Sequence, residues 1–165
     1  MAASIRATDE IQVTAPPAAV YRVLTDFEQY RKWWPAAVRV RALSVVPEVV
    51  GSDLEFHPRG GPAFRCRVEQ AIPDSLLSLR YHEGPYAGLG VWSLEPVTGG
   101  TRVRYSVDLT SEHRLLRFFA KFTNLGRSHS RLMRPVLAGL RRAVASATGG
   151  AGRRRDGEAD PLNLI

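Results

Sequence analysis

His129 is the most conspicuous residue that could do chemistry, because it is a titratable group on an otherwise apolar helical stripe. A histidine there is either a buried neutral side chain with a satisfied hydrogen bond, or one that binds a ligand or transfers a proton. In the second case Tyr81, Tyr105 or Glu83 would be its partner in proton exchange. The stripe consists of Leu115, Phe119, Phe122, Gly126, His129, Met133, Val136, Leu140 and Ala143.

A second group of residues could bind an apolar molecule. Aromatic side chains recur at alternate positions of the predicted strands and meet the same space as the helical stripe, so they either line a small-molecule pocket or pack together as an ordinary core. The loop from Glu83 to Gly90 either gates such a pocket or is a plain hairpin turn. The candidate ligand-binding residues are Phe56, Phe64, Cys66, Tyr81, Tyr86, Trp92, Tyr105, Phe122, His129 and Met133.

Other chemistries find less support. Cys66 is the only cysteine, which excludes an intrachain disulfide, and it is either a small buried hydrophobe or a nucleophile. The four histidines, at positions 57, 82, 113 and 129, have no spacing that puts two ligands on one helix face, so we expect no metal site. The glycines form no phosphate-binding pattern before a helix. We therefore expect no cofactor.

The net charge of +7 is concentrated in one segment. Residues 111–148 contain eight basic residues and one acidic residue, whereas the basic and acidic residues balance elsewhere. This basic segment is either a solvated face or a surface for an acidic protein or an anionic membrane. Nucleic acid is not expected, because exposed aromatic residues do not alternate with the basic ones.

The periodicity indicates which elements position these residues. Residues 4–14 predict a strand, Pro17 to Trp34 two short helices, and residues 38–109 six strands, since apolar positions there recur at every second residue. A long helix follows, with Ser111 as its N-cap, and Gly126 and Pro135 should kink or split it. We expect one domain over residues 4–147 and a flexible tail over 148–165.

This order resembles the START/Bet v 1-like (SRPBCC) superfamily of lipid-transfer domains, birch-pollen allergen-like proteins and polyketide cyclases. The likeness spans roughly Ile5 to Ala147. It implies an α+β helix-grip fold, in which a seven-stranded antiparallel sheet wraps around the C-terminal helix and encloses a cavity for an apolar ligand. The matching residues are Ile11, Val13, Ala15, Pro16, Val20, Tyr21, Val23, Asp26, Tyr30, Trp33, Pro35, Val49 to Gly51, Trp92, Leu94, Pro96, Gly100, Thr101, Arg102 and Val103.

The resemblance implies two functions. The first is binding or transport of a hydrophobic small molecule, such as a lipid or polyketide, in the internal cavity. The alternative is a polyketide cyclase or aromatase acting in the same cavity, with His129 as the best candidate for acid–base catalysis. No segment approaches the roughly 18 apolar residues that a membrane span needs, and we expect a soluble, cytoplasmic protein.

Overall fold

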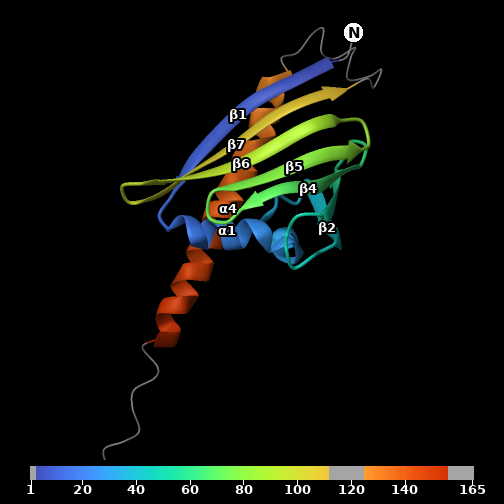
Figure 1. The fold of residues 1–165 in the computed structure, drawn as a ribbon. Helices are drawn as coiled ribbons and strands as arrows, with labels where there is room; N and C mark the ends of the chain where they lie inside the picture. The colour runs from blue at the N-terminus through green and yellow to red at the C-terminus, as the bar shows by residue number, and fades with distance from the viewer. Residues whose placement is uncertain (1–2, 112–124, 156–165) are drawn as a thin grey trace, which may run out of the picture.

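The chain forms a seven-stranded antiparallel sheet that lies against one long helix (Figure 1). A computed structural model describes residues 3–111 and 125–155. The strand order is β1-β7-β6-β5-β4-β3-β2, so the first strand pairs with the last and the second lies at the opposite edge. The strands are β1 (Ala3–Val13), β2 (Val38–Ser44), β3 (Asp53–Pro58), β4 (Phe64–Ile72), β5 (Leu76–Glu83), β6 (Ala87–Val97) and β7 (Gly100–Ser111).

Each strand buries one face, as β7 illustrates. Val103, Tyr105, Val107 and Leu109 are buried, whereas Arg104 and Asp108, which alternate with them, are exposed. Successive strand residues point to opposite faces, so this alternation turns one side of the sheet toward the core and the other toward water. The confirmed pattern therefore decides which side chains face the long helix.

Three short helical segments carry the chain from β1 across to β2. They are α1 (Pro17–Thr25), η1 (Phe27–Gln29) and α2 (Tyr30–Trp33). Pro17 opens α1, where its missing amide hydrogen costs nothing. The hydroxyl of buried Tyr30 donates a 2.6 Å hydrogen bond to the carbonyl of Leu24, which ties α2 to α1. Pro35 pushes the preceding residue out of the helical region, so α2 ends at Trp33.

The long helix α4 (Leu125–Arg155) covers the core-facing side of the sheet. Its buried residues recur at helical spacing, and it contacts β1, α1 and α2. Gly139 faces the carbonyl oxygen of Trp33 so closely that a Cβ there would overlap that oxygen. The backbones of α4 and α2 therefore meet directly. The buried residues of α4 are Met133, Val136, Leu137, Leu140 and Val144.

The α+β helix-grip fold is confirmed, including its element order, but the predicted helix boundaries were wrong. Ser111 is the last residue of β7, paired with Ala3, because the alternating pattern of β7 continues to that point. At the other end, α4 passes Thr148 and runs to Arg155, into the segment expected to be a flexible tail. Pro135 lies inside α4 without splitting it. Residues 112–124 and 156–165 lie outside the described part.

No helix in the described ranges is long and apolar enough to cross a membrane.

The contact between α4 and α2 yields a test with a matched control. Replacing Gly139 by Ala should destabilise the protein by about 2 kcal/mol, since the new methyl group would force the two helices apart. Gly149→Ala in the same helix meets no atom within 4 Å and should stabilise it by about 0.5–1 kcal/mol through helix propensity. Urea unfolding of both variants checks the prediction. If the two variants change the free energy of unfolding by equal amounts in the same direction, the close approach of α4 to α2 is contradicted.

Candidate functional site

Aromatic rings form a continuous wall along the core-facing side of β3, β4 and β5. The ring centroids of Trp34 and Phe56 are 5.5 Å apart, those of Phe56 and Phe64 are 5.0 Å apart, and those of Phe64 and Tyr81 are 5.4 Å apart. Tyr86, from the turn between β5 and β6, contacts Phe64 and Tyr81 edge-on. Strand register causes this clustering, because Phe56 pairs directly with Phe64. We call these five residues the aromatic wall.

The turn that carries Tyr86 is short. Strand β5 ends at Glu83 and β6 begins at Ala87, so three residues separate them rather than the longer predicted loop. Tyr86 and Phe64 are only half-buried, in contrast to Phe56 and Tyr81. The aromatic wall therefore retains apolar surface that the described residues leave partly uncovered.

A pair of tyrosine hydroxyls introduces polarity at the end of the wall. The hydroxyl oxygens of Tyr81 and Tyr105 are 3.0 Å apart, in hydrogen-bond contact, and Trp92 packs on Tyr105 with ring centroids 4.4 Å apart. Gly90 makes room for this pair, since a Cβ there would lie 2.5 Å from the Tyr105 hydroxyl. Burial raises the pKa of both tyrosines, so both remain neutral hydrogen-bonding groups at physiological pH.

Helix α4 adds a histidine and a serine to this polar end. The rings of His129 and Tyr105 lie 6.1 Å apart, and Nδ1 of His129 is buried without a hydrogen-bond partner. The neighbouring Ser130 donates a 3.0 Å hydrogen bond to the carboxylate of Asp9 on β1. Burial lowers the pKa of His129, and the negative charge of Asp9 opposes that shift. We call Asp9, Tyr81, Tyr105, His129 and Ser130 the polar cluster.

Sequence reasoning missed Asp9, although the alternation of β1 contains a signal for it. Ile5, Ala7, Ile11 and Val13 hold the inward positions of β1, and Asp9 occupies the one between Ala7 and Ile11. Asp9 is paired with Tyr105 in the β1–β7 ladder. A carboxylate at an inward strand position is costly unless a partner solvates it, and Ser130 is that partner.

The remaining predicted site residues fall in different environments. Cys66 is 1% exposed, and burial, assisted by the charge of Asp53, raises the pKa of its thiol, which disfavours the nucleophilic thiolate. Met133 is buried on α4, facing the core. Phe122 lies outside the described residues.

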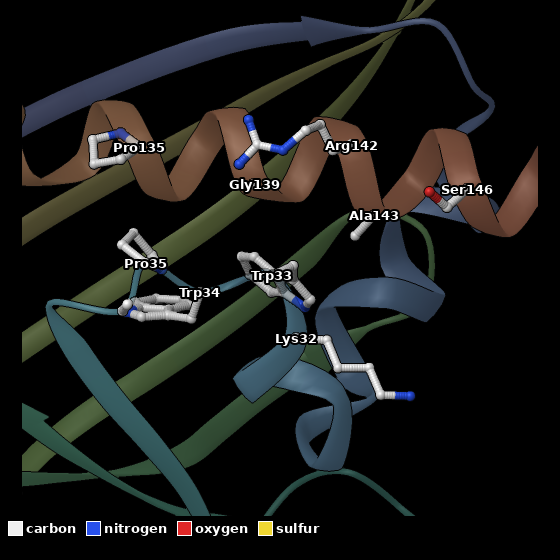
Figure 2. A pocket seen from close by; sticks show the side chains of 10 residues that line it. Lys32, Trp33, Trp34, Pro35, Pro135, Gly139, Arg142, Ala143 and Ser146 are labelled. Atoms are coloured by element: carbon white, nitrogen blue, oxygen red, sulfur yellow. The ribbon is translucent and has the colours of Figure 1, made fainter.

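An open groove of about 460 Å³ lies between α4 and the segment that joins α2 to β2 (Figure 2). Trp33 and Trp34 line it from below, and Gly139 and Arg142 line it from α4. The Nε1 atoms of both tryptophans are buried without a hydrogen-bond partner. Trp34 thus belongs both to this groove and to the aromatic wall. We call this feature the α2/α4 groove.

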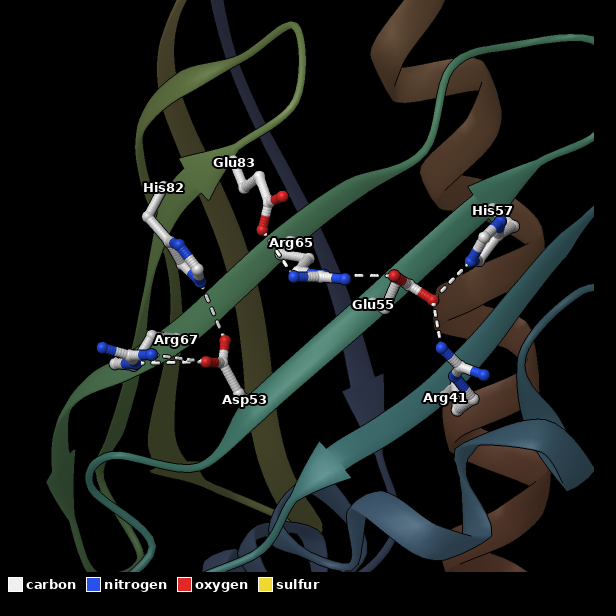
Figure 3. A network of polar contacts seen from close by, with 8 residues as sticks. All are labelled: Arg41, Asp53, Glu55, His57, Arg65, Arg67, His82 and Glu83. Atoms are coloured by element: carbon white, nitrogen blue, oxygen red, sulfur yellow. Dashed lines mark hydrogen bonds and ion pairs between the residues drawn. The ribbon is translucent and has the colours of Figure 1, made fainter.

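The predicted partnership of Glu83 with His129 was wrong. Glu83 is exposed on the outer face of the sheet, where its carboxylate lies 2.7 Å from the guanidinium of Arg65 (Figure 3). Glu83 lies two residues after Tyr81, but the β4–β5 register shifts between the Arg65–Glu83 and Cys66–Tyr81 pairs. Such an irregularity interrupts the alternation of faces along β5, and Glu83 pairs with Arg65 on the outer face. Arg65 also contacts Glu55, whose pKa is lowered to about 2, chiefly by a hydrogen bond with His57.

The other outer-face histidine is likewise bound to a carboxylate. His82 lies 2.8 Å from Asp53, which also accepts a 2.6 Å hydrogen bond from Arg67 (Figure 3). These contacts lie on the face opposite the aromatic wall, where the carboxylates of Asp53, Glu55 and Glu83 each have a basic partner. Within residues 3–111 and 125–155, no three histidine, cysteine or acidic side chains gather as a metal site.

The buried tyrosines predict how stability depends on pH. Burial raises the pKa of Tyr30, Tyr81 and Tyr105, whereas an unfolded chain releases tyrosine protons near pH 10. The native state then binds more protons than the unfolded state, so the contribution of these tyrosines to stability is constant below about pH 10 and is lost as the pH rises above it.

We expect at most two of the five tyrosines to ionise before the protein unfolds. Ultraviolet absorbance of phenolate, recorded together with circular dichroism, measures this, and the same titration in urea supplies the unfolded reference. Ionisation of four or five tyrosines in the folded state would contradict the burial of the hydrogen-bonded pair Tyr81 and Tyr105.

Comparison with solved structures places this architecture among known folds. Protein TTHA0849 from Thermus thermophilus has a TM-score of 0.68 at 19% identity, over 87% of this chain and 98% of that one. A START superfamily protein from Mycobacterium smegmatis has a TM-score of 0.65 at 13% identity, over 86% and 98%. The di-domain aromatase/cyclase StfQ, from the steffimycin biosynthetic pathway, has a TM-score of 0.67 at 15% identity, over 88% of this chain and 52% of that one.

A search of curated proteins found no match. At these identities the solved structures establish the fold. The family follows from a family model described as polyketide cyclase/dehydrase and lipid transport, which matches residues 4–145. That match includes the aromatic wall and the polar cluster. The chain therefore belongs to the polyketide cyclase/dehydrase and lipid transport family.

Proposed function

We propose that this protein binds a hydrophobic small molecule, such as a lipid or polyketide, against the aromatic wall and beneath α4. The observation that carries the proposal is the aromatic wall itself, with Phe64 and Tyr86 only half-buried. A ligand that covered these rings would remove apolar surface from water, and that removal is favourable in proportion to the area. An apolar ligand is therefore the natural occupant.

The polar cluster limits the ligand's chemistry. Nδ1 of His129 has no partner, and the Tyr81–Tyr105 hydroxyl pair retains unused hydrogen-bonding capacity beyond its shared bond. A buried polar atom without a partner costs about 1–3 kcal/mol, so a ligand group that satisfies it gains affinity. The proposed ligand is accordingly apolar over most of its length, with one polar group near α4. The family's lipid-transport members support this class.

A second function, cyclisation of a polyketide, is favoured by the arrangement of His129. In an aldol cyclisation, a base removes a proton from a carbon between two carbonyls, and that carbon then forms a bond to another carbonyl carbon, whose oxygen takes up a proton. Loss of water completes the ring. His129, with its pKa lowered by burial, would be the base, and the tyrosine hydroxyls would donate to the carbonyl oxygen. The fold shared with StfQ is consistent with this.

The binding proposal is tested with N-phenyl-1-naphthylamine, an uncharged apolar dye whose fluorescence rises on burial. Tyr86→Ala should weaken its binding about tenfold, since a lost aromatic contact of about 1.4 kcal/mol corresponds to that factor. Tyr21→Ala is the matched control. Tyr21 is also a half-buried tyrosine, but it lies on α1 outside the aromatic wall, so its variant should bind within about twofold of the parent.

Native mass spectrometry of the purified protein provides an independent readout. A co-purified apolar molecule in equimolar amount would identify the ligand class. Absence of saturable dye binding by the parent protein, or equal losses in the two tyrosine variants, would refute an interior ligand site.

The cyclase alternative is tested by His129→Gln with a synthetic linear poly-β-ketone. Cyclisation should rise with pH through a value below 6.5, since the neutral imidazole is the base, and His129→Gln should reduce the rate about a hundredfold. His82→Gln on the outer face is the control and should retain full rate. If the parent protein does not accelerate cyclisation above the spontaneous rate, or if His129→Gln has the same pH profile as the parent, the cyclase function is refuted and binding remains the proposed function.

A further inference from the structure

The α2/α4 groove has the size of a small-molecule site and lies apart from the polar cluster. Its volume of about 460 Å³ falls within the range of roughly 300–1,000 Å³ typical of ligand pockets. Tryptophan rings, prolines and alanines form much of its lining. These surfaces would accept the apolar body of a ligand.

The polar groups that line the groove are almost entirely hydrogen-bond donors. Lys32 and Arg142 bear positive charges, and none of the ten lining residues is acidic. Ser146 supplies the single side chain that both donates and accepts. A ligand that matched this lining would have to present acceptors.

The donors of the groove are also unused. Within the part of the chain that the structure describes, neither Lys32 nor Arg142 forms a hydrogen bond or ion pair. By contrast, Arg41 and Arg65 on the sheet each contact a carboxylate. The positive charge at the groove is therefore not neutralised by the protein itself.

We propose that the α2/α4 groove binds a small amphipathic organic anion, a carboxylate or phosphate joined to an aromatic or alkyl body. Lys32 on α2 and Arg142 on α4 both line the groove (Figure 2), and their positive charges attract the anionic group. The apolar body lies on Trp33 and Trp34. This proposal does not depend on the interior site.

The test uses a pair of dyes that differ in charge. 8-Anilinonaphthalene-1-sulfonate is an anion, and N-phenyl-1-naphthylamine has the same ring system without the sulfonate. The double variant Lys32→Glu with Arg142→Glu should weaken sulfonate binding about tenfold, the combined loss of two exposed charge contacts, and leave the neutral dye unaffected. Added salt should weaken binding of the sulfonate to the parent protein.

The matched control changes the same net charge next to the groove. Arg31 and Arg141 are the exposed neighbours of Lys32 and Arg142 on α2 and α4, and neither lines the groove. The double variant Arg31→Glu with Arg141→Glu should keep sulfonate affinity within about twofold. Equal losses in the two double variants would show general electrostatic attraction and overturn the proposal. Circular dichroism confirms folding, and Lys32→Gln with Arg142→Gln repeats the test with a milder change.

Nuclear magnetic resonance separates the two sites, because each of the three tryptophans has its own indole N–H signal. The sulfonate should shift the signal of Trp33, which lines only the groove, whereas an interior ligand should shift that of Trp92, which packs on Tyr105. Trp34 belongs to both sites, so its signal does not separate them. Shifts of Trp92 alone with both dyes would overturn the groove site and leave the interior site standing. Competition by octanoate and by octyl phosphate then distinguishes a carboxylate from a phosphate ligand, and displacement by neither would overturn the ligand class.

Discussion

The direct backbone contact between Gly139 and Trp33 determines how α4 lies on the sheet, because the absence of a side chain at Gly139 lets the two helices meet. When one residue of a helix is fixed against a neighbour, the directions of all its other side chains about the helix axis are fixed as well, because a helix has 3.6 residues per turn. Residues four, seven and eleven positions apart then share one face, and that face, which carries Pro135, Arg142 and Ser146, borders the α2/α4 groove. The opposite face directs Met133 to the core.

The interior combines extensive apolar surface with buried polar groups, some of which have hydrogen-bond partners while others have none. Tyr81 and Tyr105 satisfy each other, and Ser130 satisfies Asp9. His129 stands among them with Nδ1 unpaired. Buried polar groups in proteins are almost always paired, and functional sites are where exceptions persist. Under either proposed function, a ligand or substrate group that forms a hydrogen bond with Nδ1 of His129 accounts for this exception.

Charge is divided between two parts of the fold in different ways. On the sheet, most arginines are matched locally by carboxylates, as in Arg67 with Asp53 and Arg80 with Glu69, and such exposed pairs contribute little to stability. Along α2 and α4, the described Lys32 and Arg142 have no such partner. Basic charge without internal compensation attracts anions. The positive charge of Lys32 and Arg142 is thus available to a ligand at the α2/α4 groove.

The amino-acid sequence alone determined the fold and four of the five residues of the aromatic wall, because alternation in strands and helical spacing in α4 are local properties of the chain. Trp34 was missed, since it joins the wall from the segment after α2 rather than from a strand. Phe64, Tyr81 and Tyr105 were therefore predictable as residues that face one space. Tertiary structure alone decided what each of them contacts. Asp9 and Ser130 meet because β1 pairs with β7 and α4 crosses β1, and the groove exists because residues near 33 and 139 come together. Such meetings depend on strand register and helix rotation, which no short stretch of sequence encodes.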